Sequence, residues 1–520
     1  MRRSILIAAF ALATGALASE TARAGDFMAS RLSFSLTDEN LLVKPGETTP
    51  SIPGLRFGAP IPRWGTMFFD NYDTRFSGFE NLTNLVVYKA MHDGQSDFDA
   101  ALALRYNEAS DVLASLYDAG SYLKWTYWFD PTRTSKTNLA VTAFPMSSDP
   151  MRLGYSYKIS WGGSPFFSKP NPDNPYASAG ASQNTTAVPG LRIQLSGDKA
   201  YGFLGMKTTL LLNKADNQQE AVQSVLGGAG VDLTDELRVE ANGGFFDRGA
   251  NPKQDVLGAP VQTFGGTGQI VYHHGIPVGR SADFALYKND PTSLKNLFQP
   301  EEYPGGLSWL VSSEATWTGT TLEDPEKSGT TTIAPGIAGD VNFRLKLDKL
   351  RVHADLMYRN LMFVLINVPS FVPFQAISAT SATTTPEMFA AAGADYFFAG
   401  PQLTLGFTGG VQNPATFSGT LPKATIGNIP NEALPLSTTV VVRSEGDFDL
   451  LPENAAVMPI IAAKASAKLQ RGMFDVVGEI NFAFDNNVTQ LQRGSSEGSY
   501  SRVFITPYLL GFNLAFQAKF

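Results

Sequence analysis

Apolar and polar residues alternate with a period of two along much of the chain. In an extended strand this period sends successive side chains to opposite faces, so each such segment predicts a β-strand with one apolar face. Clear examples begin at Phe98, Leu123, Leu237 and Leu307. Strands of soluble proteins commonly have about five or six residues. Because these segments are longer, they favour strands that cross a bilayer, which need about ten residues each.

Two hairpins can be assigned from interruptions of the alternation. Asp348 and Lys349 separate an apolar pattern that ends at Leu347 and resumes at Leu350, which predicts a two-residue turn. In this register the apolar residues of both strands share one face. A second turn is predicted over 470–472. The whole chain is interpreted as about 18 strands, within a range of about 16 to 22.

The segment from Tyr508 to Phe520 alternates throughout and finishes on an aromatic residue. An apolar strand with an open edge is prone to aggregate, so we expect this strand to be closed against another. The pattern resembles the C-terminal strand of Gram-negative outer-membrane β-barrels, which ends on an aromatic residue, usually Phe, after apolar residues at alternate positions. The residues that carry the resemblance are Tyr508, Leu510, Phe512, Leu514, Phe516 and Phe520.

The resemblance implies a porin-like, all-β protein, namely a transmembrane antiparallel up-and-down β-barrel in the cell outer membrane. It implies that long loops face outward and short turns face the periplasm. It also implies that the six terminal-strand residues are an assembly signal for the barrel-assembly machinery. The partners expected are outer-membrane lipid, lipopolysaccharide, that machinery and small solutes. The oligomeric state does not follow from the sequence.

The N-terminal residues predict a secretory signal peptide over 1–24. A basic start at Arg2 and Arg3 precedes an apolar stretch from Ile5 to Ala18, and Ala22-Arg23-Ala24 fits the small-x-small cleavage pattern. Cleavage after Ala24 is expected, with Ala18 as the alternative site. The apolar stretch is too short to span a membrane.

Beyond the signal, residues 25–62 are interpreted as an N-terminal segment that forms a first strand, a periplasmic arm or a small hatch. Residues 63–520 are assigned to the barrel. Connections rich in Pro, Asn, Ser and Gly predict long loops. These loops are expected over 168–188, 289–306, 367–386, 412–436, 446–459 and 490–501.

Composition excludes several other classes. The 520 residues include no cysteine, which rules out disulfides, thiolate metal sites and a lipid-anchored cysteine. The 40 Lys plus Arg and 48 Asp plus Glu give a net charge of −8 spread along the chain, so nothing suggests nucleic acid. No stretch after the signal approaches the ~20 apolar residues of a membrane helix. The 36 Phe, 17 Tyr and 6 Trp suit aromatic girdles at two membrane interfaces.

The first hairpin supplies the one specific clue to selectivity. The face opposite its apolar residues carries a basic cluster, for which we expect a place on the lumen wall. Cross-strand pairing from the turn places like charges directly opposite each other, which requires compensation. Either acidic residues neutralise the cluster in a salt-bridged wall, or it favours anionic or zwitterionic solutes. The cluster consists of Arg344, Lys346, Arg351, His353 and Arg359. Candidate counter-charges on other walls are Glu240, Glu314, Asp475 and Glu479.

The apolar segment 361–376 continues a strand pattern until Pro369 and Pro373 break it. It could fold into the lumen as a constriction, or extend the barrel above the membrane, and we favour the extension.

No catalytic, cofactor-binding or metal motif is present in the sequence. Three of the four histidines, His92, His273 and His274, lie beside turn signals. The function predicted first is a passive or weakly selective channel for small solutes. The second is a structural or surface-interaction barrel with a closed lumen, and the third, less favoured, is an outer-membrane hydrolase. The prediction is therefore that the chain is not an enzyme.

Overall fold

The computed structural model describes most of the chain between residues 28 and 519. The described residues are 28–38, 41, 78–109, 112–118, 121–146, 151, 153–154, 188–213, 218–251, 254–275, 278, 306–366, 376–377, 382–419, 438–444, 447–493 and 500–519. The predicted signal peptide lies outside them, as does Phe520 of the predicted assembly signal.

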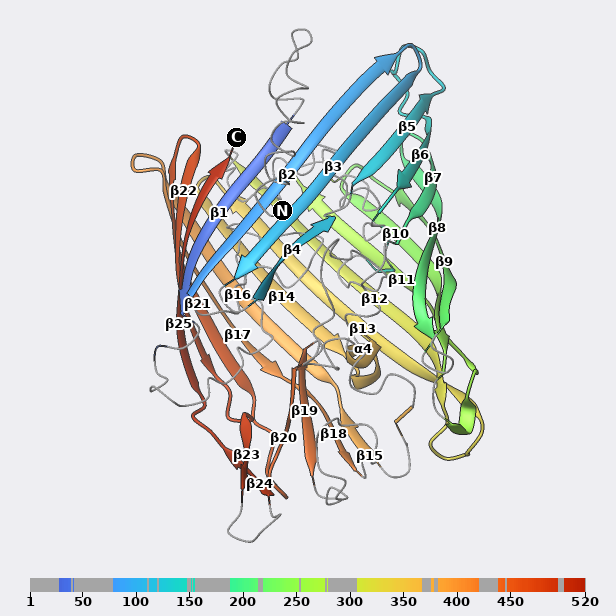
Figure 1. The fold of residues 1–520 in the computed structure, drawn as a ribbon. Coiled ribbons are helices and arrows are strands. Elements are labelled where there is room, and N and C mark those ends of the chain that lie inside the picture. The colour runs from blue at the N-terminus through green and yellow to red at the C-terminus, as the bar shows by residue number, and fades with distance from the viewer. Residues whose placement is uncertain are drawn as a thin grey trace, which may run out of the picture.

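One sheet dominates the fold (Figure 1). It has 19 strands, of which β4 (Val112–Asp118) pairs only with β3 among the described residues, so 18 strands remain in a ring. The ring strands are β1 (Met28–Asp38), β2 (Gly78–Asp93), β3 (Ser96–Ala109), β5 (Tyr122–Trp128), β6 (Asn138–Phe144), β7 (Gly190–Ser196), β8 (Ala200–Asn213), β9 (Gln218–Asp232), β10 (Leu237–Ala250), β11 (Pro260–His274), β12 (Leu307–Glu323), β13 (Thr331–Leu347), β14 (Leu350–Arg359), β16 (Glu387–Phe398), β17 (Leu403–Asn413), β21 (Ile460–Arg471), β22 (Phe474–Phe484) and β25 (Tyr508–Lys519).

The ring is closed by its first and last strands. β1 pairs antiparallel with β25 from Arg31 opposite Lys519 to Asp38 opposite Phe512, and β1 also pairs with β2. Every other ring strand pairs antiparallel with the strand before it and the strand after it. The structure therefore confirms the predicted fold class, an antiparallel up-and-down β-barrel of about 18 strands.

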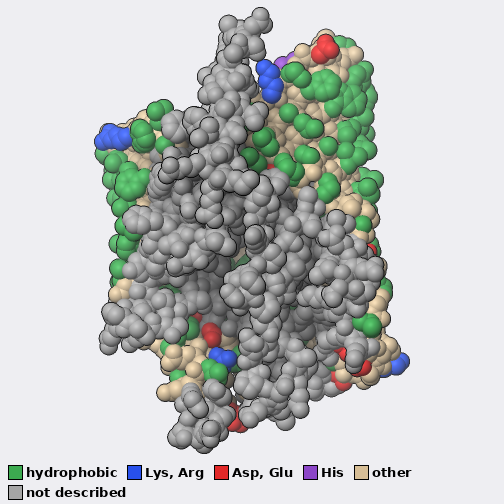
Figure 2. Space-filling view, in the orientation of Figure 1, with side chains coloured by type: hydrophobic (Ala, Val, Ile, Leu, Met, Phe, Trp, Pro, Cys, Tyr) green, Lys and Arg blue, Asp and Glu red, His purple; other side chains and the backbone are tan. Residues whose placement is uncertain are grey.

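The wall has an apolar outer face and a polar inner face, as the alternation predicts. On β13, Ile337 and Val341 are 46% and 41% exposed, whereas Asp340 and Asn342 are 5% and 1% exposed. Figure 2 shows hydrophobic side chains along the described outer wall on both sides of the view. A closed all-β wall with a lipid-compatible outer face spans a membrane. An even number of antiparallel strands, an apolar outer band and a polar interior together are characteristic of bacterial outer-membrane barrels, so the chain is an outer-membrane barrel.

The two rims of the barrel differ. Short connections such as 94–95, 197–199 and 348–349 lie at one rim, where β1 begins and β25 ends (top of Figure 1). By the rule for such barrels, we expect this turn rim to face the periplasm and the opposite loop rim to face outward. The strands that flank the predicted loop 289–306, β11 and β12, meet it at the turn rim and not at the rim expected for a long loop. The last residue of this segment, Gly306, lies at the turn rim and donates its N–H to Asp348.

The loop rim carries a second, smaller sheet (bottom of Figure 1). Its strands, in order, are β15 (Ala382–Thr385), β18 (Ala415–Gly419), β19 (Thr439–Ser444) and β20 (Asp447–Leu450). A separate hairpin is formed by β23 (Thr489–Arg493) and β24 (Tyr500–Phe504), and a 3-10 turn, η4, spans Gln254–Val256. Several segments predicted as plain loops therefore contain short strands.

The short helix α4 (Leu361–Ile366) joins the small sheet to the barrel interior. Leu361, Val364 and Leu365 share a buried cluster with residues of β18 and β19. Phe363 shares another with Leu226 of β9 and Phe246 of β10. These two residues are on the inner face, because their neighbours Val225 and Phe245 are exposed on the outer face. The expectation that 361–376 extends the barrel is therefore wrong for 361–366, since this apolar helix finds its burial inside.

No helix in the described part of the chain is long and apolar enough to cross a membrane.

Candidate functional site

The predicted basic cluster lies on the inner face of two adjacent strands. Arg344 and Lys346 belong to β13, and Arg351, His353 and Arg359 belong to β14. Lys346 is directly opposite Arg351, and Arg344 is opposite His353, which is the register that the two-residue turn predicts. The first four are buried, and Arg359 is partly exposed.

Carboxylates on neighbouring strands meet this cluster. Arg351 donates from Nε and Nη2 to the two oxygens of Asp395 on β16, at 2.8 and 2.7 Å. Arg344 lies 2.6 Å from Asp355 on β14. Such bidentate and short charge-assisted bonds are the strong members of their class.

A further pair stands nearer the loop rim. Arg359 reaches Glu387 of β16 at 2.6 Å, and Gln412 donates to the same carboxylate, also at 2.6 Å. Each of these carboxylates thus lies on the strand adjacent to that of the arginine it compensates.

The counter-charges predicted on other walls have other neighbours. Glu479 lies 3.2 Å from Lys464, and Asp475 lies 3.3 Å from Lys468. Glu314 accepts from Thr267, and Glu240 accepts from Tyr201. Cross-strand side chains are about 5 Å apart, so local partners reach a charge before groups across the lumen do.

His353 is the centre of a chain of contacts that crosses four strands. Its Nδ1 lies 3.0 Å from Oδ2 of Asp355, whose other oxygen accepts from Arg344. Its Nε2 lies 3.1 Å from the hydroxyl of Thr408 on β17, although β16 runs between the two strands. The intervening residue is Gly393, which is opposite His353 on one side and Thr408 on the other. A Cβ at this position would overlap both side chains, so only glycine permits the contact.

The order carboxylate, imidazole, hydroxyl is also that of a hydrolase triad. Here Asp355 is shared with Arg344, and the side chains of His353 and Thr408 are enclosed by the wall. The arrangement therefore holds the wall together and does not offer a nucleophile to a substrate. No group of three or more His, Cys, Asp and Glu side chains that could hold a metal occurs in the described ranges.

The other histidines lie near the turn rim. His274 contacts Glu236 at 2.7 Å and stacks on Trp309, whereas His273 is buried. The hydrogen bond from His274 lowers the pKa of the exposed Glu236 carboxyl. His92, His273 and His274, which lie beside turn signals in the sequence, occupy the ends of strands β2 and β11.

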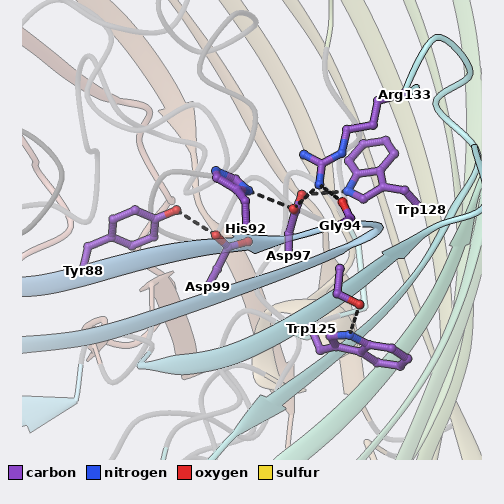
Figure 3. A network of polar contacts seen from close by, with 9 residues as sticks. Tyr88, His92, Gly94, Asp97, Asp99, Trp125, Trp128 and Arg133 are labelled. Carbon is purple, nitrogen blue, oxygen red and sulfur yellow. Dashed lines mark hydrogen bonds and ion pairs between the residues drawn. The ribbon is translucent and has the colours of Figure 1, made fainter. Parts of the chain in front are cut away.

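Figure 3 shows a polar network at the turn rim around Asp97 of β3. His92, Trp128 and Arg133 approach this carboxylate at 2.8, 2.7 and 2.6 Å. Arg133 also donates to the carbonyl of Gly94 and lies over the ring of Trp128. Its backbone is in the left-handed region, with φ of 56°, which turns the side chain back over the rim. The network ties the β5–β6 turn to the β2–β3 hairpin.

Part of the inner wall toward the loop rim is apolar. The cluster around Phe363 includes Ala338 of β13, and Met357 of β14 packs against it. Met357 also packs against a second inner cluster that contains Phe389 and Leu509. The inner wall therefore carries an apolar zone beside α4 and a charged zone nearer the turn rim.

Sequence reasoning missed Asp395, Glu387 and Thr408 as partners of the cluster. Alternation alone places Glu387 and Asp395 on one face of their strand. It does not reveal which strand pairs with β14, because a long connection separates the two.

The chain matches no protein-family model and no curated protein sequence. It is similar in structure to OpdO of Pseudomonas aeruginosa, at 10% identity and a TM-score of 0.41, over 95% of this chain and 97% of that one. The outer membrane protein OprD of Pseudomonas aeruginosa is similar at 11% identity and a TM-score of 0.38, over 96% of this chain and 97% of that one. A BenF-like porin from Pseudomonas fluorescens Pf-5 is similar at 9% identity and a TM-score of 0.40, over 95% of this chain and 98% of that one. At this identity, function has to follow from the chain's own residues.

Proposed function

We propose that the chain is a passive outer-membrane channel for small solutes. The observation that carries the proposal is the closed ring, whose outer face is apolar and whose inner face is polar and hydrogen-bonded. In outer-membrane barrels a polar interior of this kind surrounds an aqueous passage. Solutes would pass between the charged zone near the turn rim and the apolar zone beside α4.

Weak selectivity is the second part of the proposal. Arg344, Arg351 and Arg359 each contact a carboxylate, so the charges of the basic cluster are largely compensated within the wall. Compensated charges produce a weaker field in the lumen than a basic stripe would. The cluster, Lys346 and His353 included, would then give a modest preference for anionic or zwitterionic solutes.

Solute uptake into liposomes tests this part. Vesicles that contain the refolded protein should swell in small sugars and zwitterions, and slightly faster in small organic anions. Swelling no faster than that of protein-free vesicles would overturn the proposal.

A barrel with a closed lumen is the second candidate function. The observation in its favour is the buried cluster that joins Phe363 of α4 to the inner wall. A closed barrel of this kind would serve a structural or surface-interaction role. It predicts no solute uptake unless α4 is removed, which separates it from the channel.

The remaining partners are proposed from the outer wall and the last strand. The outer belt would contact membrane lipid, and the loop rim would face lipopolysaccharide. The alternation of Tyr508, Leu510, Phe512, Leu514 and Phe516, followed by Phe520, supports recognition by the barrel-assembly machinery. Deletion of Phe520 should reduce insertion into the outer membrane and leave export unchanged, whereas normal insertion would contradict this role.

We also propose that the chain has no enzymatic activity. The enclosed contacts of His353 support this view. Hydrolysis of lipid or peptide substrates that is lost on replacing a histidine would contradict it.

A further inference from the structure

Two pairs of lumen-facing side chains meet across an intervening strand. Tyr201 of β8 donates its hydroxyl to Oε1 of Glu240 on β10 at 2.7 Å, although β9 lies between them. His353 of β14 and Thr408 of β17 meet in the same way across β16. Each pair and the residue between them form a row of three cross-strand neighbours, and the middle residue is a glycine. It is Gly230 in the first row and Gly393 in the second.

Strand geometry explains why glycine is needed. Adjacent strands are about 4.8 Å apart, so the outer strands of such a row are about 10 Å apart. Side chains of a sheet stand roughly perpendicular to it, and a Cβ on the middle strand blocks the space between them. At Gly230 a Cβ would lie 2.5 Å from the ring of Tyr201 and 2.8 Å from Cγ of Glu240. Real Cβ atoms essentially never approach so closely.

A third glycine repeats the arrangement next to the first. Gly228 of β9 lies between Phe203 and Asn242, and a Cβ there would lie 2.7 Å from both side chains. Some strand glycines on the outer face have open space beside them. At Gly268 of β11 and Gly478 of β22 a Cβ would meet nothing within 4 Å.

Building on the proposed channel function, we propose that Gly230 and Gly393 are specificity-determining positions of the lumen. Each lets an ionisable side chain lie flat within the inner wall, where a neighbour two strands away holds it. Glu240 is 1% exposed and His353 is 0% exposed, so neither presents its charge to a passing solute. A side chain at either glycine would push the ionisable group toward the bore, which narrows the bore and changes its charge.

The first experiment compares Gly230→Ala with Gly268→Ala, a control substitution at a strand glycine of the outer face. The three atoms nearest to a Cβ at Gly230 belong to the side chains of Tyr201 and Glu240, so the strand can keep its backbone. The readout is the reversal potential of the refolded channel in a potassium chloride gradient. We expect Gly230→Ala to shift it toward cation selectivity, because acidic groups in a pore favour cations. Adding Glu240→Gln should cancel the shift, and Gly268→Ala should match the wild type.

The outcomes separate this inference from the proposed function. A wild-type protein without conductance overturns the channel itself. A conducting wild type with unchanged selectivity in Gly230→Ala overturns only the role of the glycine. If Gly230→Ala does not fold, Glu240→Gln alone decides. It should leave selectivity unchanged because the carboxylate is held in the wall, and a shift would overturn the inference.

The role of Gly393 in the second row is tested by the pH dependence of ion selectivity. The charged groups beside His353 are Arg344 of β13, Asp355 of β14 and Asp395 of β16. Lys464 of β21 lies opposite Thr408, on the far side of β17. Gly393→Ala should move the imidazole toward the lumen, where it titrates in the ordinary histidine range.

We expect the anion preference of Gly393→Ala to rise between about pH 7.5 and about pH 5.5 more steeply than that of the wild type. The backbone oxygen of Phe407 also crowds this position, so Thr408→Val is the second variant, which keeps the glycine and removes the holding hydroxyl. It should increase the pH dependence in the same direction. Wild-type pH dependence in both variants would overturn the role of Gly393.

Discussion

Arg351 of β14 and Asp395 of β16 form a buried, two-pronged ion pair, with Nε to Oδ1 at 2.8 Å and Nη2 to Oδ2 at 2.7 Å. The planar guanidinium matches the carboxylate in a way that lysine cannot. The pair joins adjacent strands across the connection that carries α4, and it holds the charge of the predicted basic cluster in the wall.

Asp395→Asn should destabilise the barrel strongly. It removes the carboxylate from a buried guanidinium, and breaking a buried pair on one side costs about 3–5 kcal/mol. Urea unfolding of the protein in lipid vesicles measures the loss. The double replacement Arg351→Met with Asp395→Leu should recover most of it, because apolar residues can replace a buried pair at little cost. A double variant as unstable as Asp395→Asn would show that the pair has another role.

Closure of the ring can be tested by cross-linking β1 to β25. The protein has no cysteine, so a pair introduced at Leu36 and Leu514, which are directly opposite, should form a disulfide on oxidation. Directly opposite side chains are about 5 Å apart, within the reach of a disulfide. The matched control joins Leu36 to Phe516, two residues out of register. Equal cross-linking of both pairs, or of neither, would contradict the closed register.

The apolar zone beside α4 should limit the flow of solutes. Phe363→Ala removes the ring that joins α4 to Leu226 and Phe246, so the helix loses its contact with the inner wall. We expect a larger conductance and more frequent fluctuations than in the wild type. Leu257→Ala is the control, since this side chain is exposed near the loop rim. Unchanged conductance in Phe363→Ala would mean that solutes do not pass beside α4.

Acid should loosen the β5–β6 turn only at low pH. Hydrogen bonds from Thr134, Ser135 and Thr132 lower the pKa of Asp130. A lowered carboxyl pKa contributes stability above the unfolded value of about 3.9 and loses it as the pH falls through the folded value. Pepsin should therefore spare the turn near pH 4 and cut it at lower pH. In Asp130→Asn, cleavage should already occur near pH 4, and equal resistance of both proteins would contradict this role.

The sequence predicts the barrel well because alternation acts locally. The turn at Asp348 and Lys349 fixes the register of β13 and β14, and the faces of both strands follow. The strands that begin near Phe98, Leu123, Leu237 and Leu307 are likewise predicted by pattern alone.

Features that depend on distant segments are not predictable in this way. An apolar run that continues a strand pattern gives no sign of becoming α4, because its burial depends on β9, β10 and the small loop-rim sheet. Asp395 becomes the partner of Arg351 only through the pairing of β14 with β16. From the sequence alone, Gly393 is only a residue that weakens a strand. Its proposed role follows from the positions of His353 and Thr408 on either side of it.

Single-channel conductance in a planar lipid bilayer tests the central claim most directly. The refolded, heat-modifiable protein should insert and give discrete current steps of reproducible size, with weak selectivity between potassium and chloride. Phe363→Ala should give larger steps under the same conditions. Insertion without any current, in both the wild type and Phe363→Ala, would contradict the account and leave a barrel with a closed lumen.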